Sequence, residues 1–153
     1  MYAFEPTPKL GKIIERQSEL NNRAIHLVPY AVSNVCEKTQ FYVSDNFAPG
    51  NSLIEHDPIL DEVLYAITVD QITIDEFVKR NNISRVDFIK ADIEGAERLM
   101  LEGAQETLKK FAPKLALCTY HLPDDKEVMT ELILKANPNY KIEYKWKKLY
   151  AHV

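Results

Sequence analysis

Three ionisable side chains each stand directly after an apolar, strand-like segment of the sequence: Glu5, Asp92 and His121. In open α/β sheets, ligands bind in the crevice outside the carboxyl ends of the strands. Carboxylate and imidazole groups placed there can bind hydroxyl groups, and they can act as general bases when their pKa lies near the operating pH. The three residues are therefore candidates for a binding or catalytic site.

Glu5 closes the strand-like segment Tyr-Ala-Phe at the start of the chain. In nucleotide-binding α/β folds, an acidic residue in this place accepts hydrogen bonds from ribose hydroxyls, about 20 residues after a Gly-rich turn. This sequence begins one residue before the strand, so that turn is missing ahead of Glu5. The alternative is a solvated carboxylate in front of the helix that starts after Thr7. We favour ribose binding.

Asp92 and Glu94 flank the tip of a later strand, where Gly95 permits a close backbone approach. Capping of the following helix is the alternative role for both carboxylates. Asp92 and His121 are the candidates for a general base, although a histidine at a strand end can also be purely structural. Residue spacing indicates no metal site, and only the fold can show whether Asp92, Glu94 and His121 form one.

Composition favours a single compact domain over residues 1–153, with 46% hydrophobic residues to build its core. The net charge of −4 argues against nucleic acid and membrane surfaces as partners. Cys36 and Cys118 are too few for a disulfide framework, and no apolar run approaches the roughly 18 residues that a membrane helix needs. We expect a cytoplasmic protein.

Hydrophobic periodicity predicts alternating strands and helices, which is typical of an α/β fold with a mostly parallel sheet and helices on both faces. Strands are expected at 2–4, 24–32, 39–43, 63–69, 86–91 and 114–120, and helices at 8–21, 73–81, 96–111 and 124–136. Thr73 and Glu76 have the spacing of a capping box. Segments 140–146 and 149–152 indicate an antiparallel closing pair, and residues 44–58 a long loop.

Several segments occur in the order of a known family: residues 2–8, 19–22 (ELNN), 72–78 (ITIDEFV) and 86–97 (VDFIKADIEGAE), supported by 102–104 and by 113–117 leading into His121. On these segments the chain resembles the FkbM family of S-adenosylmethionine-dependent methyltransferases. The ADIEGAE block in this context is specific, whereas FEP or TID alone would be weak.

The resemblance implies a Rossmann-like class I methyltransferase fold and S-adenosylmethionine as the methyl donor. It also implies O-methylation of a hydroxyl group. The methyl acceptor, and thus the binding partner, would be a small molecule or sugar. Glu5 would then bind the cofactor ribose, and Asp92 would contact the cofactor as well. Asp92 and His121 would face the reacting centre as catalytic residues.

Three further residues are candidates on the same ground. Ser33, just past the strand that ends at residue 32, is a candidate contact of the adenine. Ser52 lies in the long loop, where such folds often place cofactor-covering or substrate-binding groups, and a polar turn residue is its alternative reading. Glu94 is a candidate substrate-binding residue.

The chain departs from the family pattern at its amino-terminal end, where the first strand, the Gly-rich turn and the helix are missing. We therefore expect poor cofactor binding by this chain alone. Because the missing strand is central in that fold, we also expect self-association or docking of a separate amino-terminal segment. The alternatives are a non-catalytic remnant that acts as a binding module, or another nucleotide-binding α/β protein.

Overall fold

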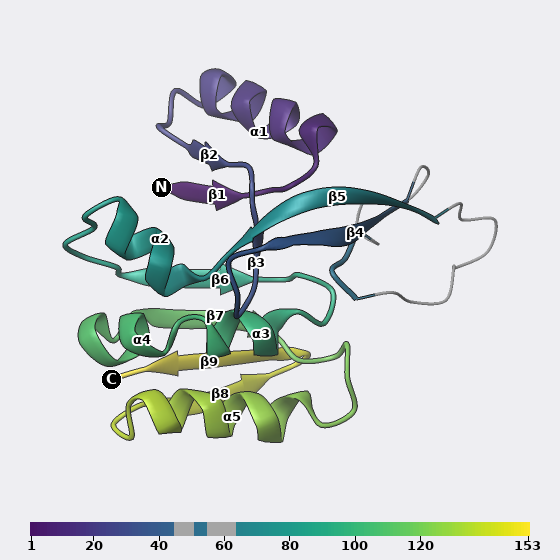
Figure 1. The fold of residues 1–153 in the computed structure, drawn as a ribbon. Coiled ribbons are helices and arrows are strands. Elements are labelled where there is room, and N and C mark those ends of the chain that lie inside the picture. The colour runs from purple at the N-terminus through teal and green to yellow at the C-terminus, as the bar shows by residue number, and fades with distance from the viewer. Residues whose placement is uncertain (45–50, 55–63) are drawn as a thin grey trace.

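The computed structural model describes residues 1–44, 51–54 and 64–153, and these form an α/β fold, as predicted (Figure 1). The predicted loop at 44–58 lies partly outside these residues. The described strands are β1 (Tyr2–Phe4), β2 (His26–Val28), β3 (Ala31–Val32), β4 (Lys38–Ser44), β5 (Leu64–Ile72), β6 (Phe88–Ala91), β7 (Lys114–Cys118), β8 (Lys141–Lys145) and β9 (Lys148–His152). The described helices are α1 (Pro8–Leu20), α2 (Ile74–Arg80), α3 (Glu97–Glu102), α4 (Gln105–Phe111) and α5 (Asp125–Ala136).

The described strands form three sheets, one parallel and two of mixed direction, instead of the one mostly parallel sheet that the alternation predicts. Strands β1 and β2 form a parallel pair, the second sheet has the order β3-β5-β4, and the third has the order β6-β7-β9-β8. Strand β5 runs antiparallel to β4, and β9 runs antiparallel to both β7 and β8. Hydrophobic periodicity predicts where a strand lies but not which strand pairs with it, and this explains why the sheet arrangement differs from the prediction. The predicted antiparallel closing pair is confirmed as β8 and β9.

Local sequence signals account for the starts of two helices. Pro8 occupies the first turn of α1, where its missing N–H costs nothing. Gly11 lets α1 approach β2 closely, because an added Cβ would lie 3.0 Å from a methyl carbon of Leu27. At α2, Thr73 Oγ1 accepts a hydrogen bond from Glu76 N at 3.0 Å, which confirms the predicted N-cap.

The helix predicted over residues 96–111 is two helices, α3 and α4, which meet at Gly103-Ala104. The carboxylate of Asp75 accepts hydrogen bonds from two backbone N–H groups at the start of α4, at 2.8 and 3.0 Å. Gly103 lies against the backbone of Ser33, so closely that an added Cβ would be 2.2 Å from the carbonyl oxygen. These contacts from distant segments break the helix, and the local sequence does not reveal them.

The main core lies between the four-stranded sheet and the helices α3, α4 and α5 (Figure 1). Its fully buried side chains include Leu101, Leu108, Leu117, Met129 and Ile133. Each such side chain stabilises the fold by about 1.5–3 kcal/mol relative to exposure. The core therefore holds β6 and β7 firmly, and their carboxyl ends carry the site described next. Among the described helices, none is long and apolar enough to cross a membrane.

Candidate active site

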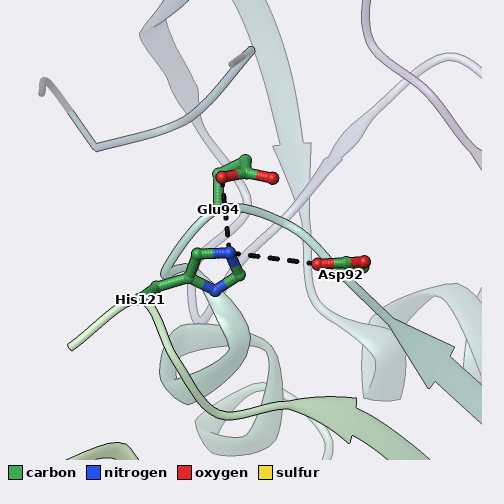
Figure 2. Close-up of side chains that lie close together, drawn as sticks. All are labelled: Asp92, Glu94 and His121. Carbon is green, nitrogen blue, oxygen red and sulfur yellow. Dashed lines mark ion pairs between the residues drawn. The ribbon is translucent and has the colours of Figure 1, made fainter. Parts of the chain in front are cut away.

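Asp92, Glu94 and His121 meet at the carboxyl ends of β6 and β7 (Figure 2). The two strands are parallel neighbours with Ala91 opposite Leu117, so both ends lie at the same edge of the sheet. His121 Nε2 lies 3.3 Å from Glu94 Oε2 and 3.9 Å from Asp92 Oδ1. The structure thus brings the imidazole of His121 to two carboxylates that lie 27 and 29 residues before it in the sequence.

The turn between β6 and α3 directs Glu94 toward the imidazole. Glu94 has a φ of 54°, a left-handed conformation that is uncommon for a residue with a side chain, and Gly95 follows with a φ of 93°. A side chain at Gly95 would be strained at this φ, and its Cβ would contact Ile54 at 3.2 Å and His121 at 3.5 Å. The glycine therefore permits the close approach that the sequence predicts.

Ser52 supports this turn from the outside. Its Oγ donates a hydrogen bond to the carbonyl oxygen of Glu94 at 3.0 Å and accepts one from Ile54 N at 2.9 Å. Its backbone pairs with Tyr42 of β4 through two hydrogen bonds of 2.9 and 3.0 Å. Ser52 is buried, and its hydroxyl contacts the protein backbone. Substrate binding by Ser52 stays a prediction.

Glu97 is a buried carboxylate that the sequence analysis missed. It accepts hydrogen bonds from Ile93 N at 2.8 Å and from Gly95 N at 3.0 Å, and its Oε2 lies 3.4 Å from His121 Nδ1. Glu97 thus fixes the turn and faces the far side of the imidazole. The signal in the sequence is its place three and four residues before the apolar pair Met100-Leu101, which puts a carboxylate on the buried face of a helix.

Asp125 and Arg98 fix the segment after β7 that carries His121. Asp125 Oδ2 accepts hydrogen bonds from His121 N at 3.1 Å and Leu122 N at 2.8 Å. Its Oδ1 accepts one from Arg98 Nε at 2.8 Å, and Arg98 also donates to Asp124 at 2.7 Å. Arg98 belongs to α3, which follows β6, so these contacts tie the two loops of the site to one another.

The Asp92 carboxylate affects the groups around it. Tyr120 donates its hydroxyl hydrogen to Asp92 Oδ1 at 3.0 Å, and burial together with this carboxylate raises the pKa of Tyr120 well above its usual range. Burial, with a contribution from Asp92, raises the pKa of the Cys118 thiol to about 11. Both groups therefore stay neutral near pH 7, and neither supplies a charge to the cluster.

The imidazole of His121 is enclosed but has no hydrogen bond of its own within the described residues. Its side chain is 9% exposed, and neither ring nitrogen makes a hydrogen bond there. Asp92, Glu94 and His121 each offer one atom that could ligate a metal ion, and these atoms lie within 4.8 Å of one another. His121 also lines an open hollow of about 550 Å³ that is formed by residues 119–123 with Lys126 and Glu127.

Glu5 and Ser33 make local contacts elsewhere. Glu5, at the carboxyl end of β1, accepts hydrogen bonds from Thr7 N and Thr7 Oγ1 on its Oε1, at 2.7 and 2.6 Å. Ser33 is buried, donates its hydroxyl hydrogen to Asn34 Oδ1 at 3.3 Å, and packs its carbonyl against Gly103. The predicted roles of Glu5 and Ser33 toward a cofactor stay predictions.

Residues 1–142 match the family model of the methyltransferase FkbM domain. The chain belongs to the FkbM methyltransferase family. The segments on which the sequence analysis based its resemblance all lie within this match. The comparison with curated proteins gives no match.

The fold of this FkbM domain is similar to a solved structure, the crystal structure of methyltransferase FkbM from Methylobacillus flagellatus KT, with a TM-score of 0.64 and 22% sequence identity. The match covers 99% of this chain and 36% of that chain. The chain therefore spans about a third of the length of the protein it resembles. At this identity, the likeness concerns the fold.

Proposed function

We propose that the chain is part of an S-adenosylmethionine-dependent methyltransferase that methylates a hydroxyl oxygen of a small molecule or sugar. The observation that carries the proposal is the meeting of Asp92, Glu94 and His121 at the carboxyl ends of two parallel strands, in a chain of the FkbM family. The hollow of about 550 Å³ beside His121 has the size of a small-molecule site and supports an acceptor of that class.

The acceptor hydroxyl must lose its proton during or after its oxygen attacks the methyl carbon. S-adenosylmethionine supplies the electrophilic methyl group, whose bond to sulfur breaks as the bond to oxygen forms. Asp92 has a side chain 35% exposed, so it can meet an acceptor, and the His121 ring lies next to it, screened from water. We assign acceptance of the proton to these two residues, and binding of a substrate hydroxyl to Glu94.

Glu5 fits the binding of the cofactor ribose. The two hydrogen bonds from Thr7 orient its carboxylate through Oε1, and within the described residues Oε2 remains to accept a bond from a hydroxyl. Since a hydrogen bond to a charged group contributes about 1.5–3 kcal/mol, Glu5→Gln should weaken S-adenosylmethionine binding by up to this amount. Unchanged affinity by calorimetry would remove Glu5 from the site. A contact of Ser33 with the adenine would require its hydroxyl to leave Asn34.

The test of the function uses the full-length protein that carries this sequence, S-adenosylmethionine labelled in its methyl group, and a panel of hydroxylated small molecules and sugars. Asp92→Asn and His121→Ala should each lower turnover about 10²–10⁴-fold. Asp87→Asn is the matched control, because Asp87 is exposed just before the other end of the same strand. Full turnover in both site variants would refute the assignment. Failure of the wild type to methylate any hydroxyl would favour a non-catalytic binding module.

Two exposed strand edges support a partner for this chain. Within the described residues β1 pairs with β2 alone and β6 with β7 alone, and Tyr2 and Phe88 on these strands are 46% and 56% exposed. Apolar side chains on unpaired edges favour the addition of a strand. We therefore propose self-association or docking of a separate amino-terminal segment. A 153-residue chain that stays monomeric in size-exclusion chromatography and binds S-adenosylmethionine at micromolar concentration would contradict this.

The two free cysteines are consistent with our proposal that the enzyme works in a reducing cytoplasm.

A further inference from the structure

We propose that Asp92, Glu94 and His121 bind a divalent transition-metal cation of the Mn²⁺ or Zn²⁺ class. The binding itself is independent of the enzymatic activity. The catalytic role of the cation rests on the methyltransferase function proposed above.

The separations of the ligand atoms suit a cation with little rearrangement. Metal–ligand bonds of about 2.0–2.2 Å place neighbouring ligand atoms roughly 3–3.6 Å apart. His121 Nε2 is 3.3 Å from Glu94 Oε2 and 3.9 Å from Asp92 Oδ1, and all three ligand atoms lie within 4.8 Å of one another. Figure 2 shows both carboxylates facing the same ring nitrogen. Small side-chain rotations would therefore complete the coordination.

The buried imidazole is a second, independent indication. The side chain of His121 is nine-tenths buried, and its Nε2 has no hydrogen bond within the described part of the chain. A buried polar atom without a partner destabilises the fold, and a metal ion at Nε2 would remove that cost. Positive charge at this point would also relieve the repulsion between two carboxylates that face one nitrogen.

Glu97 gives the imidazole the support that metal-binding histidines usually have. Such histidines donate their other ring N–H to a carboxylate or carbonyl, which sets the tautomer and the ring orientation. Glu97 Oε2 lies 3.4 Å from His121 Nδ1, and the two backbone N–H bonds hold this carboxylate in place. A proton on Nδ1 leaves the Nε2 lone pair directed at Asp92 and Glu94. We infer that Glu97 is a positioning residue for this site.

The ligand set selects the class of cation. Imidazole suits Zn²⁺, Fe²⁺ and similar ions, while carboxylates also suit Mn²⁺, and a site of two carboxylates and one imidazole falls between these preferences. Three protein ligands leave coordination positions open for oxygen atoms of a substrate. In the proposed reaction, the cation would coordinate the acceptor hydroxyl and ease the loss of its proton, as a Lewis acid does. With the cation bound, His121 Nε2 is a ligand and accepts no proton, so the proton of the acceptor hydroxyl would pass to the second carboxylate oxygen of Asp92.

The experiment is calorimetric titration of the tag-free, chelator-treated protein with MnCl₂ and, separately, with ZnCl₂, complemented by the electron paramagnetic resonance signal of free Mn²⁺. We expect one saturable site. Asp92→Asn, Glu94→Gln and His121→Ala should abolish it, and Glu97→Gln should weaken it about 10–100-fold, as loss of a supporting carboxylate does. Glu127→Gln, a carboxylate of the adjacent hollow, is the control and should bind like the wild type.

Circular dichroism of each variant separates loss of the site from loss of the fold, and Asp92→Asn, whose side chain is partly exposed, keeps the test valid if His121→Ala does not fold. Absence of binding up to millimolar cation, or equal binding by all three ligand variants, would overturn the proposal. The two proposals can fail separately. Metal binding without methyl transfer would refute the function and leave the site standing, and methyl transfer that persists without any metal binding would refute the site.

Discussion

Replacement of Glu97 by glutamine tests whether a buried carboxylate holds the turn that carries Glu94. The carboxylate uses one oxygen for Ile93 N and the other for Gly95 N. Glutamine has a single carbonyl oxygen, so one of these buried N–H groups would face an NH₂ group. Loss of a charge-assisted bond costs about 1.5–3 kcal/mol, and the remaining bond becomes a weaker neutral one. We expect Glu97→Gln to lower the free energy of unfolding by about 2–4 kcal/mol.

The assay is thermal and urea-induced unfolding followed by circular dichroism. For a domain of about 150 residues, where 1 kcal/mol corresponds to about 2–4 °C, the melting temperature should fall by roughly 4–16 °C. Glu102→Gln is the matched control on the same helix, because Glu102 is exposed and bonds only to Asn34 among the described residues. Its effect should stay within about 0.5 kcal/mol.

A Glu97→Gln variant that melts within about 2 °C of the wild type would refute this reasoning, which puts an appreciable part of the domain's stability in these two bonds. It would mean that the turn keeps its conformation without the carboxylate. The proposed support of His121 by Glu97 would then lose its basis as well.

Three further perturbations have outcomes that the structure determines. Gly103→Ala would place a Cβ 2.2 Å from the Ser33 carbonyl oxygen, so it should destabilise the fold by about 1–3 kcal/mol or more in urea unfolding, and an unchanged midpoint would contradict the close packing. Tyr140→Phe removes a buried 2.7 Å hydrogen bond to a carbonyl oxygen and should cost about 0.5–1.5 kcal/mol. Burial raises the pKa of Tyr140 to about 12 from an ordinary value of 10. The protonated Tyr140 side chain should therefore contribute fully to stability below pH 10, and this contribution should fall as the pH rises toward 12. Urea unfolding of the Tyr140→Phe variant should show a smaller loss of stability over the same pH range. Iodoacetamide should modify the exposed Cys36 and spare the buried Cys118 in the native protein, while both react after unfolding, and native modification of Cys118 in mass spectra would show that its strand opens.

The sequence by itself determined the local elements and the residues at their ends. The N-cap at Thr73 and the closing pair β8 and β9 follow from turn chemistry and periodicity over a few neighbouring residues. The placement of Asp92 and His121 just after parallel strands predicted that they lie at one edge of a sheet, and the structure confirms that they do.

Only the tertiary structure decided which distant groups meet. The antiparallel pairing of β5 with β4, and the break between α3 and α4 where Gly103 lies on Ser33, depend on contacts between segments that are tens of residues apart. The burial of Glu97 depends on two N–H groups of a left-handed turn, and a helical pattern cannot show which backbone groups face a carboxylate. Periodicity is a local property, whereas the partners and exposure of a side chain come from the packing of the whole chain. The sequence therefore pointed to Asp92 and His121, while their alignment with Glu94 around one ring nitrogen, backed by Glu97, required the fold.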